Sequence, residues 1–153
     1  MTYAKGTNVS KDRSIAEIQR TLARYKAAGF TYGEMGSRAF VGFQMVDRVV
    51  KMLLTLPEQN GKEFTQKKRG YGAYPESTSL RLWDQACREK WRALALVVKA
   101  KLESVESGIE TFDEAFLPHI VVPGAGGRTY GELALPDFAR TLETGELPKL
   151  LPM

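Results

Sequence analysis

The stretch that most constrains the fold is a run in which apolar residues recur every three or four positions. Its members are Leu80, Trp83, Cys87, Trp91, Leu94, Val98, Leu102 and Val105. This period places all of them on one face of an α-helix. The caps on offer are Ser77, Thr78 and Ser79, and the pattern stops at Gly108. The predicted helix has about 28 residues and a length of roughly 40 Å, so we expect it to be the spine of the fold.

Cys87 is the only cysteine of the 153 residues, and it lies on this apolar stripe. We therefore interpret it as a small buried hydrophobe and not as a nucleophile. A lone cysteine excludes an internal disulfide, which favours a reducing, cytoplasmic location. The polar N-terminus shows no apolar signal-peptide core, and no apolar run approaches the ~18 to 20 residues that span a bilayer. We expect no membrane association.

A shorter helix is predicted near the N-terminus, where Ile15, Ile18, Leu22 and Tyr25 share one face. Ser14 and Glu17 have the spacing of a capping box at its start, and Ser10 is a competing cap one turn earlier. Gly29 is expected to end this helix in a left-handed conformation.

A three-stranded antiparallel meander follows. Its first strand starts at residues 30–32, and "GEMGSR", residues 33–38, reads as a turn. Residues 39–45 and 48–56 form a hairpin closed by Val46 and Asp47. A two-residue loop makes Phe43 face Val50, Val41 face Met52 and Ala39 face Leu54. All six are apolar, so this sheet face should pack on the helices.

The opposite face of the sheet is more apolar than a hydrated surface requires. It carries Phe40, Gly42, Gln44, Val49, Lys51 and Leu53. Either another element or a partner covers it. We favour cover by the C-terminal region, and this face and the long helix also allow homo-oligomers.

The remaining segments complete an α+β prediction of one domain over residues 1–153. Residues 58–76 lack periodicity and form the longest loop. Thr111 and Glu114 resemble a capping box before a short helix that ends at Pro118, and residues 120–122 suggest a strand. Thr129 caps a segment through Leu135, and Pro136 restarts a helix that Gly145 ends. The predicted fold is a three-stranded antiparallel sheet packed on a long helix and a shorter N-terminal helix, with a C-terminal helical cap.

The net charge of +4 is unevenly distributed. Residues 1–107 contain 19 Lys and Arg against 11 Asp and Glu, whereas residues 108–153 contain three against seven. A basic αβββα core with an acidic C-terminal cap points to an electrostatic face that binds a polyanion, unless it is ordinary surface variation.

The sequence contains no clear catalytic signature. A single histidine, His119, and a single cysteine make a zinc site improbable, and "PGAGG" lacks the Lys-Ser/Thr of a phosphate-binding loop. Asp113, Glu114 and Glu110, or Glu132 with Asp137, could hold Mg²⁺ for phosphoryl transfer, which is the least favoured function. We predict no metal, no cofactor and no enzyme activity.

The segment "FTQKKRGYGAYPESTS", residues 64–79, is the best candidate for binding. Its cations can neutralise phosphates, its two tyrosines can stack on unpaired bases, and cations of the long helix begin where the loop ends. The predicted nucleic-acid contacts are Lys67, Lys68, Arg69, Tyr71, Tyr74, Arg81, Arg88 and Arg92. The alternative is a hydrated loop whose tyrosines fold back on the core.

DNA, single-stranded or distorted, is the favoured ligand ahead of RNA. A second function stays open, because Tyr, Trp and Arg also dominate protein interfaces. The chain would then be an inhibitor or adaptor that acts on a host enzyme or defence complex. Salt-sensitive binding to a bare oligonucleotide would distinguish the first function from the second.

Two resemblances bear on these expectations. The order helix, three strands, helix over residues 14–106 is similar in topology to the double-stranded RNA-binding domain. That family has its basic cluster at the start of a shorter second helix, where this chain reads "STSLRLW", so the resemblance implies no particular binding residues. Residues 14–25, "SIAEIQRTLARY", and 127–136, "GRTYGELALP", resemble segments of small uncharacterised phage and prophage proteins. That resemblance implies a role in phage DNA transactions or in blocking a host nuclease.

Overall fold

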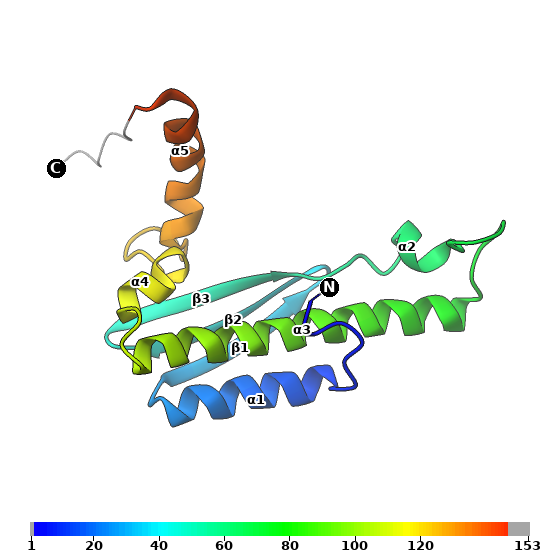
Figure 1. The fold of residues 1–153 in the computed structure, drawn as a ribbon, viewed down its shortest axis with the longest axis horizontal. Helices are drawn as coiled ribbons and strands as arrows, with labels where there is room; N and C mark the ends of the chain where they lie inside the picture. Colours follow the sequence, from blue (N-terminus) through cyan, green and yellow to red (C-terminus); the bar gives the residue numbers. More distant parts are fainter. Residues whose placement is uncertain (1, 147–153) are drawn as a thin grey trace.

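The computed structural model describes residues 2–146 as an α+β fold, with one three-stranded sheet and helices on one of its faces (Figure 1). The elements are α1 (Lys11–Arg24), β1 (Ala28–Met35), β2 (Arg38–Met45), β3 (Arg48–Thr55), α2 (Lys62–Thr65), α3 (Glu76–Glu106), α4 (Phe112–Phe116), the 3₁₀ helix η1 (Leu117–His119) and α5 (Tyr130–Thr144). The predicted fold class is confirmed. In residues 2–146, no helix is both long enough and apolar enough to cross a membrane.

The long helix α3 is the spine that its apolar period predicts. Trp91, Val98 and Leu102 are fully buried, and Cys87 and Leu94 lie beside them in the core. The predicted N-terminal caps are wrong. The helix starts at Glu76 after Pro75, whose φ of −54° already suits a helix start, so Ser77, Thr78 and Ser79 lie inside the first turn.

The ends of α1 also differ from the prediction. Ser10, and not Ser14, is the N-cap, and its side chain accepts a hydrogen bond from the Arg13 backbone N–H. Ser14 is buried inside the helix. The helix ends at Arg24, and Lys26 takes the left-handed conformation with φ of 62°. Gly29 instead lies in β1, where the register shifts in a β-bulge.

The sheet has the order β1-β2-β3, with both neighbouring pairs antiparallel. The predicted hairpin register is confirmed, because Phe43 pairs with Val50, Val41 with Met52 and Ala39 with Leu54. The predicted turn at residues 33–38 is too long. Strand β1 continues to Met35, which pairs with Arg38, so only Gly36 and Ser37 form the turn.

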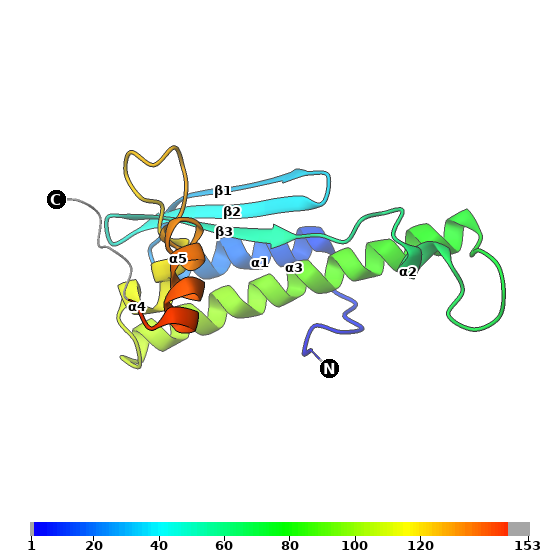
Figure 2. The ribbon, with the colours of Figure 1, turned by 90° about the horizontal axis from the view of Figure 1, so that it is seen from above.

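The two faces of the sheet differ in cover. The inner face, which includes the fully buried Val41 and Val50, packs against α1 and α3 (Figure 2). The other face, called the outer face below, consists of alternate residues of the strands: Thr31, Gly33, Met35, Arg38, Phe40, Gly42, Gln44, Val49, Lys51, Leu53 and Thr55.

Within residues 2–146, the C-terminal region covers the outer face only in part. The segment after η1 approaches it, where Val121 donates a backbone hydrogen bond to Val49 and Lys51 donates to the Gly127 carbonyl. Phe40 and Leu53 keep exposed fractions of 37% and 57%. The suggested strand at residues 120–122 is reduced to isolated bridges, one of them between Val50 and Ile120.

The C-terminal third consists of short helices at one end of α3. Thr111 and Glu114 form the predicted capping box of α4, whose Phe112 and Phe116 are buried in the core. Thr129 caps α5 in the same way, and Gly145 ends it with φ of 73°. Pro136 does not restart a helix but lies inside α5, which is continuous.

Candidate nucleic-acid interface

The first turns of α3 extend past the sheet, and α2 packs against them (Figures 1 and 2). Phe64 is the buried residue of α2, and the Trp83 indole N–H donates to the Pro57 carbonyl at 2.8 Å. We call the segment of residues 66–75 the basic loop. It connects α2 to α3, so both of its ends are fixed to the same helical support.

The basic loop is a small hairpin. Gln66 and Ala73 form an isolated antiparallel bridge, and the Lys67 N–H donates to the Gly72 carbonyl at 3.2 Å. Gly70 and Gly72 have φ of 87° and 106°, a conformation that residues with a side chain rarely adopt. The two glycines therefore make the reversal that presents residues 68–71 at the tip.

Every predicted cation of the loop is exposed. Within residues 2–146, the side chains of Lys67, Lys68 and Arg69 form no hydrogen bond or ion pair. Tyr71 is fully exposed, at 103% of its reference area, so it does not fold back on the core. Tyr74 is half-buried, and its backbone N–H donates to Thr65 at 2.8 Å.

The cations of α3 divide into two groups. Arg81 is exposed, lies five residues after the start of the helix and is close to the loop in sequence. Arg88 forms an ion pair with Asp84 at 2.9 Å. Arg92 lies about 24 Å along the helix from Glu76 and forms an ion pair with Glu17 of α1. The structure therefore groups Arg81 with the loop, and it gives Arg88 and Arg92 intramolecular partners.

Lys62 is a residue of this region that the sequence interpretation missed. It is exposed on α2, one turn before the basic loop. It carried no signal in the sequence, because the helical turn of α2 could not be recognised inside an aperiodic segment. The acidic C-terminal helices α4 and α5 lie at the opposite end of α3 from the loop, so they do not mask it (Figure 1).

The candidate metal-binding carboxylates have other partners. Asp113 forms two hydrogen bonds of 3.1 Å with Arg48, and Glu110 accepts from Ser104. Asp137 pairs with Arg140. Hydrogen bonds from the backbone N–H groups of Thr111 and Thr129 lower the pKa of Glu114 and of Glu132, respectively. Glu132 also lies 3.6 Å from Lys51. Within residues 2–146, no three His, Cys, Asp or Glu side chains form a group that could hold a metal ion.

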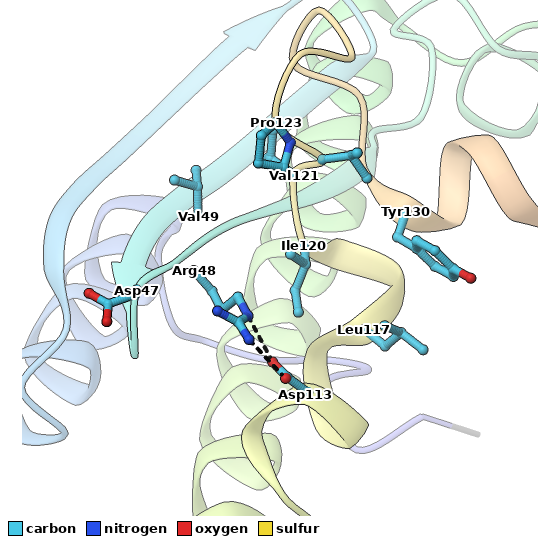
Figure 3. A pocket seen from close by; sticks show the side chains of 10 residues that line it. Asp47, Arg48, Val49, Asp113, Leu117, Ile120, Val121, Pro123 and Tyr130 are labelled. Carbon is cyan, nitrogen blue, oxygen red and sulfur yellow. Dashed lines mark hydrogen bonds and ion pairs between the residues drawn. The ribbon is translucent and has the colours of Figure 1, made fainter. Parts of the chain in front are cut away.

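A hollow of about 360 Å³ lies between the β2–β3 turn and the C-terminal helices (Figure 3). Its walls are mainly apolar, with Leu117, Ile120 and Tyr130 on one side. Arg48 and Asp113 also line the hollow, and their hydrogen bonds raise the pKa of the Arg48 guanidinium. His119 belongs to η1, where burial lowers its pKa. The hollow thus contains an apolar surface and an internally neutralised charge pair.

Comparison of the chain with protein-family models, with curated proteins and with solved structures finds no match.

Proposed function

We propose that the protein binds nucleic acid through the basic loop, with single-stranded or distorted DNA as the favoured ligand. The observation that carries the proposal is the full exposure of Tyr71 next to three cations that lack an internal partner within residues 2–146. An unpaired base can stack on such a ring while the cations contact the neighbouring phosphates. No catalytic step is part of this role.

Two further features support anion binding at this end. Lys62 and Arg81 flank the loop and extend its positive charge over α2 and α3. The start of α3 has no side-chain cap, so its first backbone N–H groups and the positive end of the helix dipole face the same region. The proposed surface is therefore Lys62, Lys67, Lys68, Arg69, Tyr71 and Arg81, with Tyr74 as a support from below. The predicted contacts Arg88 and Arg92 are not needed for it.

The test is a titration of fluorescent single-stranded and double-stranded oligonucleotides, followed by anisotropy at several salt concentrations. We expect binding to the single strand that weakens steeply with salt. Exchange of Lys67, Lys68 and Arg69 for Glu should abolish binding and leave the melting temperature unchanged, since none of the three side chains packs in the structure.

A matched control separates a local contact from the total charge. Exchange of Arg13, Arg20 and Arg24 for Glu changes the net charge equally, and all three residues are exposed on α1. We expect this variant to bind far better than the loop variant. Equal loss in both variants, or unaltered binding in the loop variant, would refute the proposed surface.

A protein-binding role is the second candidate, and one observation favours it. Helix α5 exposes Leu135, Phe138 and Leu142. Neighbouring exposed apolar side chains of this kind mark interaction surfaces, whereas single ones do not. The phage-like segments of the sequence fit either role, in DNA transactions or in contact with a host protein.

A further inference from the structure

As far as residues 2–146 show, helix α5 is anchored at its beginning. Thr129 and Gly131 are buried, and the Tyr130 N–H donates to the Ile120 carbonyl at 2.8 Å. Beyond this first turn the helix projects from the body next to β3 (Figure 1). Leu135, Phe138 and Leu142 follow the spacing i, i+3, i+7 and share one side of the helix. Their exposed fractions are 57%, 53% and 71%, so this apolar stripe has no partner within residues 2–146.

The outer face of the sheet is a second exposed apolar surface. Phe40, Val49 and Leu53 are 37%, 45% and 57% exposed. The surface is hollowed around Gly42, between Phe40 and the segment that contains Val121 and Gly127. At Gly33, which also carries no side chain, the Phe40 ring lies directly over the backbone. A side-chain carbon added at Gly33 would meet that ring at 2.6 Å.

The two surfaces match in charge and size. On the outer face, Arg38 is exposed and forms no ion pair within residues 2–146, whereas Lys51 already lies 3.6 Å from Glu132 of its own chain. On the α5 side, Asp137 is paired with Arg140, and the exposed Glu143 and Glu146 are the carboxylates that remain for Arg38 of a second copy. A 15-residue helix is about 22 Å long and an eight-residue strand about 26 Å, so one helix can cover the length of the face.

Helix α5 does not lie on the sheet of its own chain. It leaves the body at the β3 edge, where Glu132 lies 3.6 Å from Lys51. Figures 1 and 2 show that it then runs away from the strands on the helix side of the sheet. Within residues 2–146, the stripe is therefore left open, and so is the part of the outer face that the segment after η1 does not reach.

We propose that two copies of this chain form a symmetric dimer in which α5 of each copy lies across the outer face of the other copy's sheet. A twofold axis makes the two contacts identical, so one arrangement covers both stripes and both faces. The occupant is a second copy because this chain itself carries the two complementary surfaces. The proposal is independent of nucleic-acid binding, since the basic loop lies at the other end of α3.

The first measurement is the mass of the full chain in solution, by sedimentation equilibrium and light scattering from about 1 to 100 µM. One chain has a mass of 17.1 kDa, and we expect twice this value with a concentration-dependent approach to it. A mass of one chain at every concentration would overturn the proposal. It would do so even if the stripe turned out to bind a different protein.

Two variants test the surfaces separately. Phe138→Glu with Leu142→Glu charges the stripe, and Leu53→Glu charges the outer face. All three positions are more than half exposed, so the fold should persist, which circular dichroism can verify. Each variant should weaken the dimer and raise its dissociation constant at least tenfold. Val97→Glu, at a 42% exposed position of α3, is the control and should leave it unchanged.

Mixing the two variants gives the sharpest result. A mixed dimer retains one intact contact, between α5 of the Leu53→Glu chain and the sheet of the chain with the altered stripe. We therefore expect partial recovery of the dimer in the mixture and none in either variant alone. In a helix-to-helix or a sheet-to-sheet dimer, one of the two variants alone would dimerise as well as the parent, and that outcome would overturn the proposed arrangement.

Discussion

Arg92 of α3 and Glu17 of α1 form an ion pair that joins the two helices beneath the sheet. Their side chains are 23% and 32% exposed, so the pair is partly shielded from water. Arg92→Ala should therefore lower the free energy of unfolding by about 1–2 kcal/mol in urea denaturation. Its effect should nearly disappear in a Glu17→Gln background, as a double-mutant cycle can show.

The same substitution separates the structural role of Arg92 from a role in binding. We expect Arg92→Ala to keep oligonucleotide affinity within about twofold of the parent and to leave its salt dependence unchanged. Loss of a loop cation that contacts a phosphate should instead reduce the slope of log affinity against log salt concentration by about 0.7 to 0.9. A large affinity loss for Arg92→Ala with unchanged stability would return this residue to the binding surface.

The two tyrosines of the basic loop should differ in role, with Tyr71 contributing to binding and Tyr74 to stability. Tyr71 is fully exposed, so Tyr71→Ala should weaken single-strand binding by about 1–3 kcal/mol without a change in melting temperature, and Tyr71→Phe should retain the affinity. Tyr74 is half-buried, so Tyr74→Ala should lower the melting temperature. Equal affinities for Tyr71→Ala and the parent, measured by anisotropy, would argue against stacking.

Elements with a buried face were predictable from the sequence. The stripe of α3 and the β2–β3 register each follow from apolar spacing, because burial of one face fixes which residues must repeat. The ends of the elements were less predictable. Ser10 and Ser14 both fit a cap, and the choice depends on Ser14 facing the core, which is a tertiary effect.

The candidate site was only half predictable, for a related reason. Exposure of the loop follows from its polar, glycine-rich sequence. The partner of Arg92, however, lies 75 residues away, and no local pattern pairs it with Glu17. The spacing of Leu135, Phe138 and Leu142 was visible in the sequence, but a helix with this pattern usually packs on its own domain. The direction of α5 in the structure is what leaves this stripe open within the described part of the chain.

The start of α5 should tolerate no side chain at position 131. A β-carbon on Gly131 would lie 2.7 Å from the Pro118 carbonyl oxygen, which belongs to the backbone and cannot rotate away. Gly131→Ala should thus destabilise the protein by about 1–3 kcal/mol, although Gly→Ala in a helix is otherwise stabilising. Thermal unfolding gives the sign directly, and a rise in melting temperature would show that η1 and α5 are not held together as described.

The β2–β3 turn should be improvable. Val46 and Asp47 have φ of 52° and 57°, the left-handed pair of a type I′ turn. A β-branched residue is strained there, whereas Asn-Gly is the preferred sequence. Val46→Asn with Asp47→Gly should stabilise the fold by about 1 kcal/mol, a rise of roughly 2–4 °C in melting temperature. An unchanged or lower value would mean that Val46 makes compensating contacts.

The Cys87 thiol should not react with reagents while the protein is folded. Its titration should also lower the free energy of unfolding at high pH. Burial, followed by the charges of Asp84 and Glu34, raises the pKa of its thiol from 9.0 to about 11. The folded state therefore retains a proton that the unfolded state loses. The contribution is complete below pH 9 and is lost as the pH rises towards 11, by about 2–3 kcal/mol. Urea denaturation of the parent and of Cys87→Ala should show a stability difference that shrinks over this range, because other titrating groups cancel in the comparison.

At pH 8, a thiol reagent should label the parent only as fast as it unfolds, and rapid labelling in native buffer would contradict the burial of Cys87.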